Sequence, residues 1–234
     1  NGIDYVTNNP ETDSFVEQHY TFKKINERAK NKKVLRQKFN LPEPEHDRNN
    51  PPIIAIVSRL SEQKGLDLVM EAIEPLINSS DIQFIILGTG ESKYISYFQE
   101  LDKKYPNVAA HLSYDNVLPH LIYAGADMIL IPSHFEPCGL TQMEAMRYGA
   151  VPIVRRTGGL ADSVEDYNPI TDTGTGFVFV RYDSYALFGA IIRAIEIYKF
   201  QKIWQGIQKR AMSSDFTWEK SAREYEKLFE KAAG

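Results

Sequence analysis

Two carboxylates, Glu136 and Glu144, lie on either side of a short loop that could hold a phosphorylated ligand. The apolar run at 128–131 is typical of a buried parallel strand, and an apolar stripe predicts a helix over 140–148. The first amide groups of a helix lack acceptors and lie at the positive end of its dipole, which suits a phosphate. Amides of this kind belong to Gly139, Leu140 and Thr141. The loop can therefore bind a phosphate, with acceptors for sugar hydroxyls on both sides.

Two cations, Arg59 and Lys64, follow another expected strand and precede a helix. A departing nucleoside diphosphate gains negative charge as the bond to its sugar breaks. Fixed cations aimed at that charge stabilise the transition state more than the ground state. The forked guanidinium of Arg59 suits two phosphate oxygens, and Lys64 supplies a point charge. Either residue alone would count as a surface cation in a loop. Together with the glutamate loop they indicate a phosphate site.

The composition of the 234-residue chain is that of an ordinary globular protein, with 43% hydrophobic and 25% charged residues. A net charge of −4 gives no general attraction to nucleic acid or to anionic membranes, and no apolar run approaches a membrane span. The single cysteine, Cys138, excludes an intrachain disulfide and fits a reducing cytoplasm. The sequence has no Gly-x-Gly-x-x-Gly after its first strand, no P-loop and no His/Cys cluster with metal spacing. A dinucleotide oxidoreductase and a zinc site are therefore disfavoured.

Short apolar strands alternate with helical patterns through the middle of the chain. Strands are expected at 53–57, 83–87, 108–111, 128–131, 151–154 and 176–180. Helices are expected at 66–76, 94–105, 118–123, 140–148 and 185–198. This alternation predicts an α/β fold: a Rossmann-like parallel sheet with helices on both faces and right-handed crossovers. Ligands of such sheets bind beyond the carboxyl ends of the strands, where all the loops described above are expected to lie.

The two ends of the chain are expected to flank this sheet. Residues 1–50 comprise a polar edge segment and a basic helical stretch at 23–39, residues 51–200 form the core sheet, and residues 201–234 form C-terminal helices. The basic stretch could bind a polyanion, but no aromatic residues interleave with its charges, so a solvated helix face is favoured. Prolines between 42 and 52 mark a break before the first strand.

Four ordered stretches resemble one family of enzymes. Glu136 and Glu144 match the two-glutamate motif of retaining glycosyltransferases with the two-domain GT-B fold. The sequence motif Phe-Glu-Pro-Cys-Gly-Leu-Thr-Gln around Glu136 is similar to that of bacterial, archaeal and plastid glycogen and starch synthases. The other stretches, in the order and spacing of that family, are 58–67, 120–127 and 155–162. The resemblance covers nearly the whole chain. It implies that residues 1–234 form one C-terminal, nucleotide-sugar-binding GT-B domain, without the N-terminal acceptor domain.

The resemblance also implies roles for individual residues. Arg59 and Lys64 would act as catalytic groups that stabilise the departing diphosphate in place of a metal ion. Glu136, the third catalytic group, would accept hydrogen bonds from the glucosyl unit of the donor. Glu144 would hold the ribose hydroxyls of the nucleotide, with a plain exposed helix residue as the alternative. Further donor contacts are implied for Gly88, Tyr114, Cys138, Gly139, Leu140, Thr141, Thr157, Gly158 and Gly159.

Several of these positions also have structural explanations. The Gly-x-Gly at Gly88 and the flexible turn at 157–159 could simply be tight turns. Tyr114 would stack on the nucleobase or pack at the sheet edge. Its surroundings, Ser-Tyr-Asp-Asn, depart from the family's Gly-Tyr-Asp-Glu, so the base preference stays open. Cys138 lies at a helix start, where a thiolate would be stabilised, but no histidine partner is close in sequence and a small residue simply fits there.

The resemblance implies the donor-binding half of a glycogen synthase. Such an enzyme transfers glucose from ADP-glucose or UDP-glucose to the non-reducing end of an α-1,4-glucan with retention, and no metal or cofactor is expected. The glucan would bind mainly to the N-terminal domain, against which the last helix would pack, so this chain alone should be largely inactive. No nucleic-acid or membrane partner is expected. The alternatives are another retaining GT-B transferase, sucrose synthase-like or trehalose-forming, and a non-catalytic nucleotide- or glucan-binding module.

Overall fold

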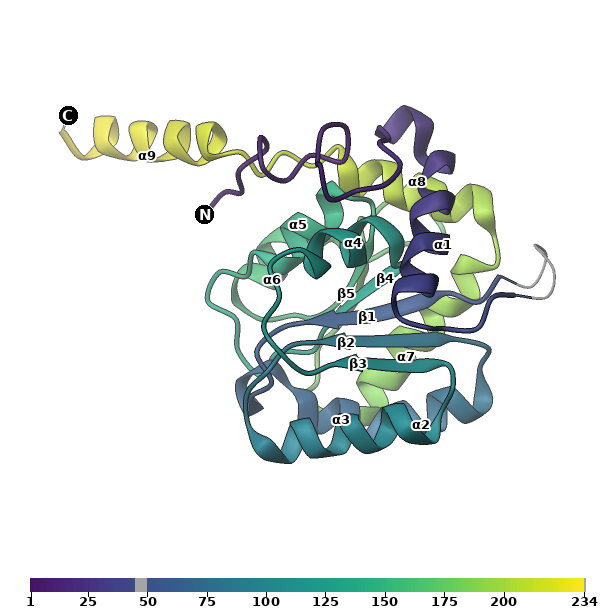
Figure 1. Ribbon diagram of the computed structural model, residues 1–234. Coiled ribbons are helices and arrows are strands. Elements are labelled where there is room, and N and C mark those ends of the chain that lie inside the picture. Colours follow the sequence, from purple (N-terminus) through teal and green to yellow (C-terminus); the bar gives the residue numbers. More distant parts are fainter. Residues whose placement is uncertain (45–49, 234) are drawn as a thin grey trace.

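The computed structural model describes residues 1–44 and 50–233 and contains a six-stranded sheet in which all neighbouring strands are parallel (Figure 1). The strands are β1 (Ile53–Val57), β2 (Gln83–Leu87), β3 (Val108–His111), β4 (Met128–Ile131), β5 (Val151–Arg155) and β6 (Phe177–Phe179). Their order across the sheet is β3-β2-β1-β4-β5-β6. The predicted α/β, Rossmann-like parallel sheet is confirmed. The predicted break at 42–52 lies partly outside the described residues.

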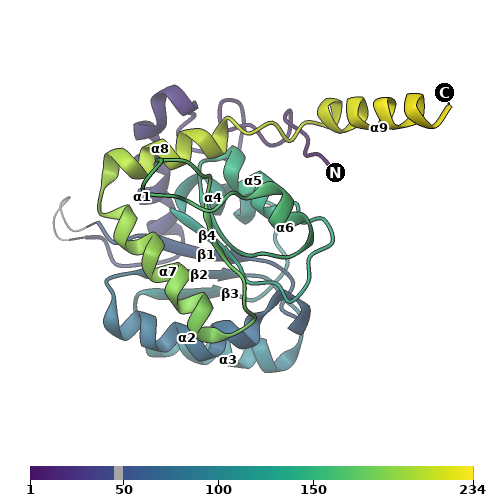
Figure 2. The same cartoon turned by 180° about the vertical axis from the view of Figure 1, so that it is seen from behind.

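Helices cover both faces of the sheet. One face carries α2 (Leu66–Ser79), α3 (Ser92–Lys104) and α7 (Ser184–Tyr198). The other face carries α1 (Arg28–Lys38), α4 (Leu118–Gly125), α5 (Thr141–Arg147) and α6 (Gly158–Ser163). The chain continues through α8 (Gln201–Met212) into α9 (Trp218–Ala233), which extends away from the sheet and its helices in both views (Figure 2). Short 3-10 helices lie at Phe22–Glu27 and Glu62–Lys64.

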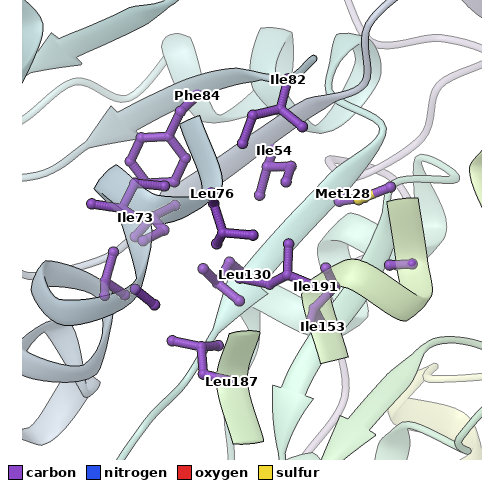
Figure 3. Close-up of a cluster of buried hydrophobic side chains, with 14 of the residues drawn as sticks. Ile54, Ile73, Leu76, Ile82, Phe84, Met128, Leu130, Ile153, Leu187 and Ile191 are labelled. Carbon is purple, nitrogen blue, oxygen red and sulfur yellow. The ribbon is translucent and has the colours of Figure 1, made fainter. Parts of the chain in front are cut away.

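The two-residue repeat of the strands divides the core between the two faces. Ile54 of β1 belongs to a buried cluster with side chains of α2, α3 and α7, whereas its neighbour Ile53 belongs to a cluster with α1, α4 and α5. Both faces of the sheet are therefore apolar, which explains why the strands form continuous apolar runs in the sequence. Figure 3 shows the first cluster, where strand residues meet Leu76 of α2 and Leu187 of α7.

Several boundaries differ from the predicted ones. The helix after β4 is Thr141–Arg147 rather than 140–148, and β6 is shorter than the predicted 176–180. The flexible turn predicted at 157–159 is wrong, because Thr157 precedes α6 and Gly158 and Gly159 are its first two residues. Two successive glycines disfavour a helix in isolation, so the sequence alone gave no helical signal there. Packing against a neighbouring loop accounts for this six-residue helix.

The prediction of a solvated helix face holds for only part of the basic stretch before the sheet. Its exposed cations are Lys23, Lys24, Lys30, Lys33 and Lys38, but three other cations are buried. Arg28, Lys32 and Arg36 of α1 are each at most 5% exposed. Arg28 donates hydrogen bonds to carbonyl oxygens at the C-terminal ends of α4 and α5, where the helix dipoles favour a cation. The Nζ atom of Lys32 lies 2.7 Å from Oδ2 of Asp127, which also accepts a hydrogen bond from the amide of Ile53. These contacts tie α1 to the amino ends of β1 and β4.

The buried Lys32 gives the stability of the fold a characteristic pH dependence. Burial lowers the pKa of Lys32 to about 8 from 10.5, despite the opposing attraction of Asp127. The folded chain therefore binds fewer protons at this site than the unfolded chain between those pH values, and its stability rises with pH across this window. We predict that the unfolding free energy of the wild type, minus that of Lys32→Met, increases from pH 8 to pH 10 in urea titrations. A flat or falling difference would contradict this assignment.

Candidate functional site

The loops that carry the predicted site residues all leave the carboxyl edge of the sheet. Arg59 and Lys64 follow β1, Gly88 follows β2, and Tyr114 follows β3. The segment 136–141 follows β4, and 157–159 follows β5. The strands β1 and β4 are neighbours, with β2 on the far side of β1 and β5 on the far side of β4. The sheet order reverses between them, and such a switch point opens a crevice in which ligands of α/β proteins bind.

Lys64 and Glu136 meet across this switch point. The Nζ atom of Lys64 lies 2.6 Å from Oε2 of Glu136, and the hydroxyl of Ser133 donates to the same oxygen at 3.1 Å. Both charged side chains are largely shielded, with exposed fractions of 19% for Lys64 and 10% for Glu136. A shielded carboxylate is stable here because it has a cation and a hydrogen-bond donor as partners. Lys64, predicted to bind the phosphate, and Glu136, predicted to bind the sugar, therefore neutralise each other in this structure.

A small pocket of about 50 Å³ adjoins this ion pair. Its lining combines Lys64 and Glu136 with the start of α5 and the loop before it, including Gly139, Leu140 and Thr141. The amide groups of these last three residues have no hydrogen-bond partner within the described residues. The pocket is large enough to hold ordered water. A phosphate could therefore reach the amides and Lys64 together once Lys64 and Glu136 separate.

The remaining predicted residues do not line this pocket. Arg59 and Cys138 are exposed, and Tyr114 is 84% exposed, which excludes the alternative of a tyrosine packed at the sheet edge. Gly88 follows β2, and a Cβ atom there would lie 1.8 Å from the carbonyl oxygen of Ser58. Cys138 lines a separate cavity of about 450 Å³ that also borders Gly159 and the first turns of α9.

Glu144 lies in the first turn of α5 and is half-buried rather than exposed. Burial raises the pKa of its carboxyl group, and hydrogen bonding with the hydroxyl of Tyr123 partly offsets this effect. Hydroxyl donors of a ligand would stabilise the ionised form in the same way as Tyr123 does. Glu144 is thus a partly desolvated acceptor rather than a solvated helix residue.

Hydrogen bonds to the backbone hold the loop around Glu136 in place. The Nε atom of Arg155 donates to the Ser133 carbonyl at 2.8 Å, and the Gly159 amide donates to the Glu136 carbonyl at 3.0 Å. A Cβ atom at Gly158 would lie 2.1 Å from the Glu136 carbonyl oxygen, so only glycine permits this close approach. Sequence reasoning assigned no role to Ser133 or Arg155. The available signal was a polar residue at the end of each apolar strand or within two residues of it.

No group of three or more His, Cys, Asp or Glu side chains in residues 1–44 and 50–233 is arranged to hold a metal ion. No helix within these ranges is long and apolar enough to cross a membrane.

The fold and this crevice define an α/β protein with a cation, a carboxylate and free amides at the switch point of its sheet. The chain belongs to the family of glycosyl transferases group 1, whose family model matches residues 37–210. This confirms the predicted class of protein.

Its similarity to individual glycosyltransferases extends over nearly its whole length. The chain is 44% identical to the glycogen synthase of Thermosipho africanus and 47% identical to that of Anoxybacillus flavithermus, with 99% and 98% of the chain covered. It covers 47% of each of these proteins, so the chain spans about half the length of the curated relatives it matches.

A solved structure gives the same result. The catalytic domain of starch synthase IV from Arabidopsis thaliana, bound to ADP and acarbose, superposes with a TM-score of 0.89 at 38% identity. The match covers 99% of this chain and 48% of that one. The predicted GT-B type of sheet and the resemblance to glycogen and starch synthases are confirmed.

Proposed function

We propose that this chain is the donor-binding half of a glycogen synthase, a retaining hexosyltransferase that moves glucose from ADP-glucose or UDP-glucose to the non-reducing end of an α-1,4-glucan. The observation that carries the proposal is the contact between Lys64 and Glu136 at the switch point, next to unpartnered amides. These groups match the charge of a diphosphate and the hydroxyls of a sugar. The glycogen synthases and the starch synthase to which the chain is similar support the same assignment.

Donor binding exchanges the partners of the ion pair. The diphosphate takes Lys64 away from Glu136 and also binds Arg59 and the amides of residues 139–141. The released Glu136 keeps its hydrogen bond from Ser133 and gains hydrogen bonds from the hydroxyls of the donor glucose. The carboxylate of Glu136 is shielded from water, so losing Lys64 would destabilise it unless the sugar hydroxyls bind in its place. Release of Lys64 and binding of the sugar are therefore coupled.

The same groups stabilise the transition state. As the bond between the glucosyl carbon and the diphosphate oxygen breaks, its electrons remain on the diphosphate, where Arg59 and Lys64 lie. The departing diphosphate accepts the proton of the glucan hydroxyl, and this hydroxyl oxygen bonds to the glucosyl carbon from the face that the diphosphate leaves. The configuration is thereby retained. The two cations take the place of a metal ion, so we propose that the transfer needs no metal.

The nucleoside part of the donor lies between the loop after β3 and the start of α5. Tyr114 stacks on the base, for which its exposed ring is available, and Glu144 accepts hydrogen bonds from the ribose hydroxyls. Gly88 and the turn of Cys138 border the donor. Thr157, Gly158 and Gly159 border it from the side of β5.

The other half of the enzyme completes the active site. We propose that residues 1–234 form a single C-terminal domain and that an N-terminal domain supplies most of the glucan site. Apolar side chains of α9, which is described in full and has no buried residue, fit such a partner domain. These exposed side chains are Trp218, Tyr225, Leu228 and Phe229. A cytoplasmic location is part of the proposal.

The first test is calorimetric titration of the chain with ADP-glucose and UDP-glucose. We expect one of them to bind, and we expect Lys64→Ala or Arg59→Ala to weaken binding about 10- to 100-fold, because each change removes a charged hydrogen bond worth about 1.5–3 kcal/mol. Lys103→Ala, an exposed lysine of α3 paired with Glu100, is the matched control and should bind normally. Binding of neither nucleotide sugar to the wild type would favour a non-catalytic module.

The second test is transfer itself. We expect the chain alone to bind the donor and to incorporate little or no labelled glucose into glycogen, because domain closure assembles the site and excludes water. Sustained elongation of glycogen by residues 1–234 alone would contradict the division of roles between the two halves.

A further inference from the structure

Gln142 is a fully buried polar residue whose side chain turns back over the loop before α5. Its Nε2 atom lies 3.0 Å from the carbonyl oxygen of Gly139, 3.4 Å from that of Cys138 and 2.9 Å from the hydroxyl of Ser163 in α6. Its Oε1 atom is buried and has no hydrogen-bond partner among the residues that the structure describes. A buried amide whose nitrogen bonds to the loop before α5 and to Ser163, while its oxygen has no partner among the described residues, requires an explanation.

The orientation of this amide follows from its neighbours. With oxygen and nitrogen exchanged, the oxygen would face the carbonyl oxygens of Cys138 and Gly139, which are acceptors only. The hydroxyl of Ser163 could not rescue that arrangement, because its hydrogen is already donated to the carbonyl of Gly159 at 2.6 Å. The Nε2 atom of Gln142 therefore faces the loop, and it binds the two carbonyl groups that precede α5.

Fixing these two carbonyl groups also fixes two amides. In a trans peptide the C=O and N–H groups of one plane point in opposite directions. The carbonyl of Cys138 shares its plane with the amide of Gly139, and the carbonyl of Gly139 shares its plane with the amide of Leu140. Both carbonyls point to Gln142, so both amides point away from it. These two amides are among the unpartnered donors at the pocket beside Lys64.

The loop needs this constraint because of Gly139. Its φ is +67°, a conformation that glycine adopts readily and other residues rarely do. A side chain there would also place its Cβ atom 2.5 Å from Oε1 of Gln142. Glycine permits the required backbone but also permits others, including rotation of the adjoining peptide planes. The hydrogen bonds of Gln142 select the backbone conformation in which the amides of Gly139 and Leu140 point away from Gln142.

We propose that Gln142, held in place by Ser163, is a positioning residue that orients the phosphate-binding amides of Gly139 and Leu140. This role rests on the proposed function, since it concerns the diphosphate of the same donor. Gln142 borders the same pocket, but its amide nitrogen donates to the loop, so the proposed role acts through the backbone. The α6 helix thereby contributes to donor affinity through Ser163, although that hydroxyl lies behind the loop.

The test compares Gln142→Met with Gln208→Met. Methionine is similar in length and removes the donor in both variants. Gln208 of α8 is 5% exposed and donates to the carbonyl of Gly149 at 2.8 Å, away from the loop, so the control loses a buried hydrogen bond of the same kind. Calorimetry with ADP and UDP, well below the melting temperature of each variant, measures the effect. We expect both variants to melt earlier, and Gln142→Met alone to bind the nucleotide at least tenfold more weakly.

Ser163 supplies a milder second comparison that does not depend on the folding of Gln142→Met. Ser163→Ala removes the acceptor behind Gln142 and should weaken nucleotide binding about threefold, whereas Ser163→Thr keeps the hydroxyl and should bind within twofold of the wild type. Equal affinity of Ser163→Ala and wild type, or equal losses in Gln142→Met and Gln208→Met, would overturn the positioning role. The proposed function would survive that result as long as the wild type binds ADP or UDP.

Discussion

The contact between Lys64 and Glu136 is the interaction on which the rest of the site depends. Each partner is too shielded to stand alone, so each requires the other until a ligand supplies a better partner. We propose that a diphosphate attached to a sugar does so for both at once, because it carries negative charge for Lys64 and hydroxyls for Glu136. Under this proposal the pair links the recognition of charge to the recognition of the sugar within one crevice.

The strand order of the sheet brings these two side chains to the same point. They follow β1 and β4, which are separated in the chain by two strands but adjacent in the sheet. At the amino ends of the same two strands, Asp127 bonds to Lys32 and to the amide of Ile53. At the carboxyl ends, the loop with Glu136 is held from several sides by hydrogen bonds to its backbone. The two strands are therefore fixed at both ends, and this fixes the positions of Lys64 and Glu136 relative to each other.

The sequence predicted the elements that have a local repeat, such as the strands, and the loops that match a motif. The buried strands were found because both their faces are apolar, and the loops were placed correctly because parallel strands share one carboxyl edge. The buried cations of α1 were missed because their partners are distant carbonyl groups and Asp127, which leave no periodic signal. The α6 helix was missed because it begins with two glycines. These residues allow close packing against the loop before α5, which the local sequence does not reveal. Gln142 was visible in the motif, but its role depends on the direction of two peptide planes.

The most direct measurement is a crystal structure of the chain with ADP in the presence of EDTA. The account predicts that the terminal phosphate contacts Lys64, Arg59 and the amides of residues 139–141, and that the Nζ atom of Lys64 has left the 2.6 Å contact with Glu136. An intact ion pair with the diphosphate bound elsewhere would contradict it, as would diphosphate binding that appears only when a divalent cation is added.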